Sequence, residues 1–157
     1  LRPTNAGAAT SALFEMKKGA AFLVRQDQQN DAQIFMIFFE KNTAKYGAGI
    51  YFGDTPNEAE EGCSGEHNHL ITDSTISGNK VLDLENGIGG GMYVGTTSNL
   101  TLRNSKLLNN DGASQGGAIV AYSAGTIELD DVSISENKAQ SGAGIYAMCT
   151  AVCNTDI

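Results

Sequence analysis

The sequence predicts an all-β fold, a right-handed parallel β-helix of about five coils with about three short strands in each. Three observations favour it. A glycine-rich block recurs along the chain, an Asn precedes each clear copy, and the runs between copies alternate apolar and polar residues. Glycine makes up 19 of the 157 residues, proline occurs twice and tryptophan is absent, which excludes a coiled coil or a disordered chain. We therefore expect residues 1–157 to form one β-helix domain, as part of a longer chain.

The repeat sets the size of one coil. The glycine-rich block begins at residues 19, 47, 89, 116 and 142, so successive copies are 28, 42, 27 and 26 residues apart. One unit is thus about 27 residues long, and the second carries an insertion. Runs such as 100–103 and 126–130 alternate as strands with one buried face do, and no unit holds an amphipathic helical stripe. Parallel crossovers are nearly always right-handed, which gives the expected hand.

Two kinds of residue mark the corners of the expected coil. Each clear block starts with a glycine, which permits a positive φ at a sharp corner; these are Gly47, Gly89, Gly116 and Gly142. An Asn follows an apolar residue by three positions at a second corner; these are Asn42, Asn79, Asn110 and Asn137. We expect their amides to stack about 4.8 Å apart in a hydrogen-bonded ladder.

Three columns of apolar side chains should fill the interior of the coil. The first is Phe22, Ile50, Met92, Ile119 and Ile145. The second is Ile71, Leu102 and Leu129, and the third is Phe39, Ile76, Leu107 and Ile134.

The blocks Gly-Gly-Ala-Ile at 116–119 and Phe-x-x-Asn at 39–42 resemble the repeats of chlamydial polymorphic outer membrane proteins. Those repeats are marked by Gly-Gly-Ala-(Ile/Leu/Val) and Phe-x-x-Asn, and the resemblance covers roughly residues 13–148. It implies a secreted or surface-exposed right-handed β-helix that serves as a stalk, passenger or adhesive module. It carries over no catalytic residue, because the motif residues of that family are structural.

Charge and cysteine content bear on partners and location. Ten Lys and Arg against 18 Asp and Glu give a net charge of −8, which disfavours nucleic acid. No apolar run is long enough for a membrane span. Asn99 begins the one N-glycosylation sequon, and the three cysteines, Cys63, Cys149 and Cys153, leave their pairing open. We expect an extracellular or cell-surface protein.

An acidic insertion is expected at 53–69. It contains Asp54, Glu58, Glu60, Glu61, Glu66, His67 and His69 beside Cys63. Carboxylates suit Ca²⁺ and a His-x-His pair with Cys suits Zn²⁺, but the spacing matches no established ligand frame. The favoured interpretation is a solvated loop, with no metal and no cofactor.

Tyrosines lie next to the first apolar column. Alternation sends Tyr51, Tyr93 and Tyr146 outward, in one stripe with Leu23 and Val120. Such a stripe could stack on sugar rings or bury against another chain. The alternative is a ladder in which the rings only stack on one another, or an inverted register with the tyrosines inside.

One carboxylate–arginine group can be built by aligning the coils on their Asn residues. Asp73, Asn104 and Asp131 then share a column, and Thr72, Arg103 and Asp130 share the next, which brings Asp130 and Asp131 near Arg103. Clustered carboxylates with an Arg serve polysaccharide-cleaving enzymes. An ordinary cross-strand ion pair is the favoured interpretation.

The segment 34–39 is apolar on both faces, so we expect the side that carries Phe35 and Phe38 to pack against another segment or chain. We also expect the last coil to be continued by more protein. The function predicted is a non-catalytic structural or adhesive module of a fibre, coat or adhesin stalk. Its partners would be other chains, further copies or glycans. The alternative is a polysaccharide lyase or hydrolase, or a glycan-binding module, on the same fold.

Overall fold

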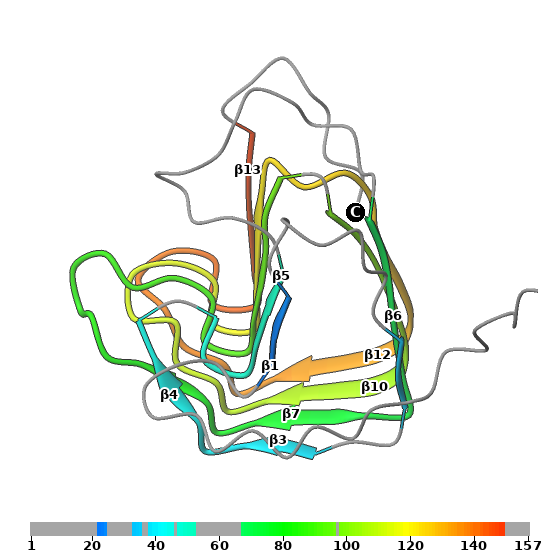
Figure 1. Cartoon of the computed structure of the whole chain (residues 1–157). Helices are drawn as coiled ribbons and strands as arrows, with labels where there is room; N and C mark the ends of the chain where they lie inside the picture. Colours follow the sequence, from blue (N-terminus) through cyan, green and yellow to red (C-terminus); the bar gives the residue numbers. More distant parts are fainter. Residues whose placement is uncertain are drawn as a thin grey trace, which may run out of the picture.

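The computed structural model describes residues 22–24, 33–35, 38–45, 47–52, 67–96 and 98–149 (Figure 1). Within these ranges the regular structure is entirely β, in strands β1 to β13, and every strand pair is parallel. The described residues include no helix that is long and apolar enough to cross a membrane. The all-β class with parallel sheets is therefore confirmed.

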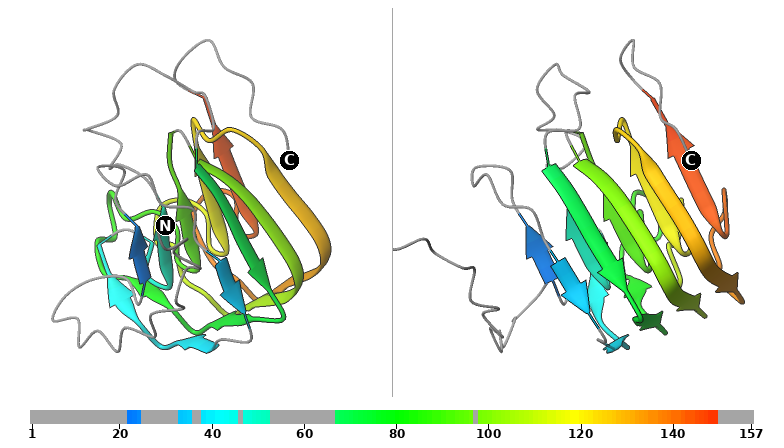
Figure 2. Two further views of the ribbon diagram at one scale, coloured as in Figure 1. Left: turned by 45° about the vertical axis from the view of Figure 1, so that its right-hand side comes forward. Right: turned by 90° about the vertical axis from the view of Figure 1, so that its right-hand side faces the viewer.

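The strands form three sheets, and each sheet takes one strand or more from successive units. The first sheet contains β1 (Phe22–Val24), β5 (Ile50–Phe52), β9 (Met92–Val94), β11 (Ile119–Tyr122) and β13 (Ile145–Met148). The second contains β2 (Gln33–Phe35), β3 (Phe38–Glu40), β6 (His67–Thr72), β7 (Thr75–Ser77), β10 (Ser98–Leu108) and β12 (Ile127–Ser135). The third contains β4 (Thr43–Ala44) and β8 (Lys80–Val81). Figure 2 shows the strands following one another in chain order.

The later units contain longer strands than expected. Strand β10 is 11 residues long and β12 is 9 residues long, so each joins two of the short strands predicted for one coil. One residue at positive φ turns the corner inside each of them, Asn104 at 44° and Asp131 at 53°. The parallel pairing of β10 with β12 runs from Leu100↔Ile127 to Arg103↔Asp130 and resumes after this corner, from Ser105↔Val132 to Leu108↔Ser135.

The main core lies between the first sheet and both parts of the second sheet, the part that contains β6 and the part that contains β3 and β7 (Figure 1). The three expected apolar columns all line this core where their side chains are described; the side chain of Phe22 lies outside the described residues. Most members are fully buried, but the last unit contributes partly buried side chains, Leu129, Ile134 and Ile145.

The insertion ends earlier than expected. Strand β6 already begins at His67, so residues 67–69 of the expected loop 53–69 belong to a sheet. His69 is 2% exposed and its ring stacks on Phe52 at a centroid distance of 4.0 Å. A histidine can occupy a strand position that points into the core, because the flat faces of its ring pack against apolar side chains. Residues 53–66, with Cys63 and the acidic side chains, lie outside the described residues, as does Cys153.

Candidate functional site

The four predicted asparagines form a hydrogen-bonded ladder that crosses the units. Asn42 Nδ2 donates to Asn79 Oδ1 (2.8 Å), Asn79 Nδ2 to Asn110 Oδ1 (2.9 Å), and Asn110 Nδ2 to Asn137 Oδ1 (3.0 Å). Each oxygen also accepts the backbone N–H of the preceding Asn. The second proton of the amide goes to a carbonyl of the preceding unit, as from Asn110 to Ile76 O. Asn79 and Asn110 are fully buried, and the ladder satisfies their amides.

Glycines make room for this ladder. Gly47, Gly89, Gly116 and Gly142 take φ values between 50° and 71°, as corners require. A second glycine of the block lies against the ladder: a Cβ on Gly91 would stand 2.5 Å from Ala118 O and 3.2 Å from Asn110 Nδ2. The glycine block and the Asn column are thus two parts of one packing arrangement.

Two buried serines form a further polar link that sequence reasoning missed. Ser74 N donates to Ser105 Oγ at 3.1 Å. Each hydroxyl donates to the backbone carbonyl two residues before it, Ser74 to Thr72 O and Ser105 to Arg103 O. Both side chains are at most 2% exposed. The signal was present, since each serine follows the aligned pair Asp73 and Asn104 by one residue. The link ends in the next unit, where Val132 takes the position of Ser105.

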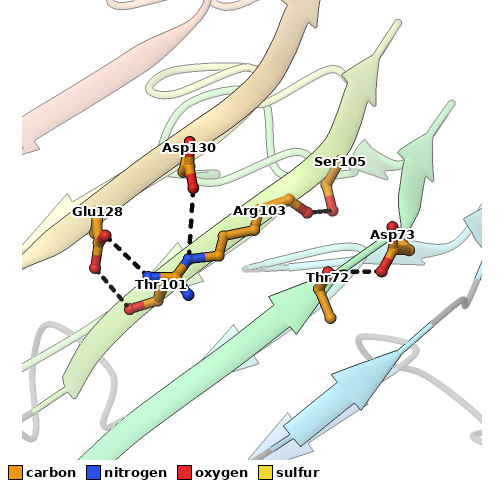
Figure 3. A network of polar contacts seen from close by, with 7 residues as sticks. All are labelled: Thr72, Asp73, Thr101, Arg103, Ser105, Glu128 and Asp130. Atoms are coloured by element: carbon orange, nitrogen blue, oxygen red, sulfur yellow. Dashed lines mark hydrogen bonds and ion pairs between the residues drawn. The ribbon is translucent and has the colours of Figure 1, made fainter.

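The one predicted carboxylate–arginine group lies on the outer face of the second sheet (Figure 3). The register pairs Thr72 with Arg103 and Arg103 with Asp130, as the alignment on Asn predicts. Arg103 Nη2 contacts Glu128 Oε1 at 3.1 Å, and Arg103 Nε contacts Asp130 Oδ2 at 3.7 Å. Glu128 was missed, although it precedes Asp130 by two residues and therefore shares its face.

The Arg103 network is exposed and charge-paired. The side chains of Arg103, Glu128 and Asp130 are 49%, 53% and 67% exposed. Glu128 Oε2 also accepts a hydrogen bond from Thr101 Oγ1. Exposed pairs of this kind contribute about 0.2–1 kcal/mol each. The Arg103 network therefore links neighbouring strands on a solvated face of the sheet.

The neighbouring column turns the corner between the two halves of the sheet. Asp73, Asn104 and Asp131 all have positive φ, and Asn104 Nδ2 donates a hydrogen bond to Asp73 Oδ1. Asp131, which was expected near Arg103, makes no ion pair among the described residues. The described part of the chain holds no group of three His, Cys, Asp or Glu side chains that suits a metal ion.

The tyrosine stripe is buried, so the expectation of an outward, accessible stripe is wrong. Tyr93 is 0% and Tyr51 is 5% exposed, and their rings stack at 4.6 Å. Tyr146 is partly buried against the same cluster, which also contains Ile88 and Val120. These tyrosines lie outside the main core cluster, and with Ile88 and Val120 they form a second apolar cluster. The self-stacking ladder, the alternative weighed for this stripe, describes Tyr51 and Tyr93.

Asn99 lies on the outer face of β10 and is separate from the asparagine ladder. Its Nδ2 donates to Asn68 Oδ1 at 3.0 Å, and its Oδ1 accepts the backbone N–H of Thr126 at 2.8 Å. The folded chain thus uses the sequon amide for pairing between strands.

The expected assembly face is described in part. Phe38 is 72% exposed on β3, whereas Ile34 and Phe39 point into the core at 3% and 6%. The side chain of Phe35 lies outside the described residues. Cys149, at the end of the described chain, is exposed.

Comparison of the chain with models of protein families, with curated proteins and with solved structures finds no match.

Proposed function

We propose that the chain is a right-handed parallel β-helix and serves as a non-catalytic structural or adhesive module of an extracellular or cell-surface assembly. The asparagine ladder carries this proposal. The polar side chain that recurs in four units is buried or half-buried and binds the next unit, so the recurring polar chemistry stabilises a stack. Sheets whose strands follow chain order in parallel register support the same architecture.

The outer surface supports a structural role over a catalytic one. The tyrosines that would hold a sugar ring are buried, and Arg103 is paired with two exposed carboxylates. An open strand face whose carboxylates are paired with an arginine is what cross-strand pairing on a structural module requires.

Phe38 is the side chain through which we propose contact with a second copy of the chain. It is the most exposed large apolar side chain among the described residues, at 72%. It stands on β3, within the segment 34–39 whose sequence is apolar on both faces. An aromatic ring exposed in this way favours burial against a partner surface.

The test is sedimentation velocity of the whole chain over a range of concentrations. Phe38→Asp should abolish concentration-dependent association and leave the circular dichroism spectrum unchanged. Leu84→Asp is the matched control, because Leu84 is 68% exposed on a turn away from β3. A chain that stays monomeric at all concentrations, or equal effects of the two variants, would contradict self-association through Phe38. Cleavage of an acidic or neutral polysaccharide that Asp130→Ala abolishes would overturn the non-catalytic role.

A further inference from the structure

The turn that follows β8 is longer than the turns in the same place of the other units. The corner glycine follows the ladder Asn by ten positions here, at 79 and 89, and by five or six positions elsewhere. The extra residues form the green loop that reaches past its neighbours in Figure 1. This loop, residues 82–87, contains Asn86-Gly87, the one Asn-Gly pair of the chain.

An Asn-Gly pair can lose the side-chain amide without an enzyme. The backbone nitrogen of the glycine attacks Cγ of the asparagine, and the approach is open because glycine has no Cβ in the way. Asn86 itself is accessible, since its side chain is exposed to water. Whether the pair reacts therefore depends on the freedom of Gly87 N.

The fold holds Gly87 in place. Its N–H donates to Asp83 O at 2.9 Å, and the residue is buried. Gly87 O accepts from the backbone N–H groups of Ser114 and Gln115, at 3.1 and 3.3 Å. A Cβ on Gly87 would overlap Val81 Cγ1, so the surroundings leave little room for this peptide group to rotate.

The Asp83 carboxylate adds a second restraint on the loop. Its Oδ1 accepts the backbone N–H of Glu85 at 3.1 Å and that of Asn86 at 3.0 Å. The side-chain amide of Asn86 also interacts with this carboxylate. Attack of Gly87 N on Asn86 Cγ therefore requires the loop to open first.

We propose that Asn86 is a deamidation site that the closed loop 82–87 blocks and that local opening of this loop exposes. In the open loop a bond forms between Gly87 N and Asn86 Cγ, the Cγ–Nδ2 bond breaks, and ammonia leaves with the proton of Gly87 N. Water then opens the cyclic imide at either carbonyl and gives aspartate or isoaspartate. The net reaction consumes one water, releases one ammonia and needs no oxidant.

Either product hinders the loop from closing again. Aspartate places a negative charge beside the Asp83 carboxylate, where like charges repel and an amide donor is lost. Isoaspartate lengthens the main chain next to Gly87, whose N–H and C=O both bind backbone groups. The site thus keeps a record that the loop has opened, which refolding does not erase.

The test follows the conversion of Asn86 in the whole chain at mildly alkaline pH by peptide mass mapping. In guanidinium chloride, where the loop is unfolded, Asn86 should react before any other asparagine. In buffer alone its rate should be lower by about tenfold or more, because only the open fraction reacts. Hydrogen exchange at Gly87 N should be slowed in buffer for the same reason.

A matched pair of variants tests the part that Asp83 plays. Asp83→Ala should raise the rate in buffer severalfold and speed hydrogen exchange at Gly87, but leave the rate in guanidinium chloride unchanged. Glu85→Ala is the control and should react as the parent does, because the Glu85 side chain is exposed and its backbone N–H is kept.

Four results would each overturn the inference. They are equal rates with and without denaturant, another asparagine reacting before Asn86 in denaturant, Asp83→Ala as slow as the parent, and Glu85→Ala as fast as Asp83→Ala. If circular dichroism shows that Asp83→Ala does not fold, the two rates of the parent chain decide.

Discussion

Asn110→Ala is the sharpest perturbation of the ladder. The side chain is 0% exposed and takes part in four hydrogen bonds. It accepts from the backbone N–H and the amide of Asn79, and it donates to Ile76 O and Asn137 Oδ1. Alanine removes all four and leaves no side-chain group that can replace them.

The expected cost follows from the two donors of Asn79 that lose their acceptor. A buried polar group without a partner costs about 1–3 kcal/mol, so the free energy of unfolding should fall by about 2–6 kcal/mol. That is a large part of the roughly 5–15 kcal/mol by which domains are stable. Asn42→Ala should cost about 1 kcal/mol, because the half-buried Asn42 side chain makes one ladder bond.

Urea unfolding followed by far-ultraviolet circular dichroism measures both variants. Lys106→Ala is the control on an exposed position of β10 and should stay within about 0.5 kcal/mol of the parent. The slope of the unfolding curve should not change, since the surface exposed on unfolding is the same. Equal losses for Asn110→Ala and Lys106→Ala, or a larger loss for Asn42→Ala than for Asn110→Ala, would refute the reasoning.

Three further predictions use the same preparation. Gly91→Ala should cost about 1–3 kcal/mol, because its Cβ would lie 2.5 Å from a backbone oxygen, whereas Gly144→Ala, with 3.7 Å of room, should be neutral in urea unfolding; equal effects would contradict this. Tyr93→Ala should cost about 3–5 kcal/mol by urea unfolding, since the ring is 0% exposed, and a loss under about 0.5 kcal/mol would mean an open stripe. Hydrogen bonds from the backbone N–H groups of Asn86 and Glu85 lower the pKa of Asp83 below its ordinary value of 3.8. Its stabilisation should be complete above pH 3.8 and be lost as the pH falls through the lower folded-state pKa, and an NMR titration midpoint at or above 3.8 would contradict this.

Much of the fold follows from residues whose physical need repeats. Each unit needs one corner residue at positive φ and one buried amide, so a glycine such as Gly116 and an asparagine such as Asn110 occur once in each unit. The spacing of these residues reveals the period, and their alignment reveals the register. That register correctly predicted Arg103 opposite Asp130. The joining of short strands into β10 was not predictable in this way, because it depends on a corner that Asn104 turns alone.

The candidate site was less predictable from the sequence, because the repeat period does not tell which side chains are buried by their neighbours. Alternation tells which face Tyr93 occupies, but not that the side chain is buried there in a second apolar cluster. His69 was expected in a solvated loop, whereas it lies in strand β6 and packs in the core against Phe52. The polar composition of the insertion did not reveal where the strand begins, because tertiary packing decides that.

The ladder also has a consequence for how such a chain changes in evolution. Its hydrogen bonds link residues 37, 31 and 27 positions apart, so the spacing varies while the partner in the next unit does not. A duplication or deletion of one whole unit keeps every amide opposite another amide and alters only the length of the stack. A change that moves an interior Asn by one position along its corner takes the amide out of the column and breaks two links at once. Tandem duplication can thus adjust the reach of the molecule, and loops between ladder positions can grow, without any new core being required.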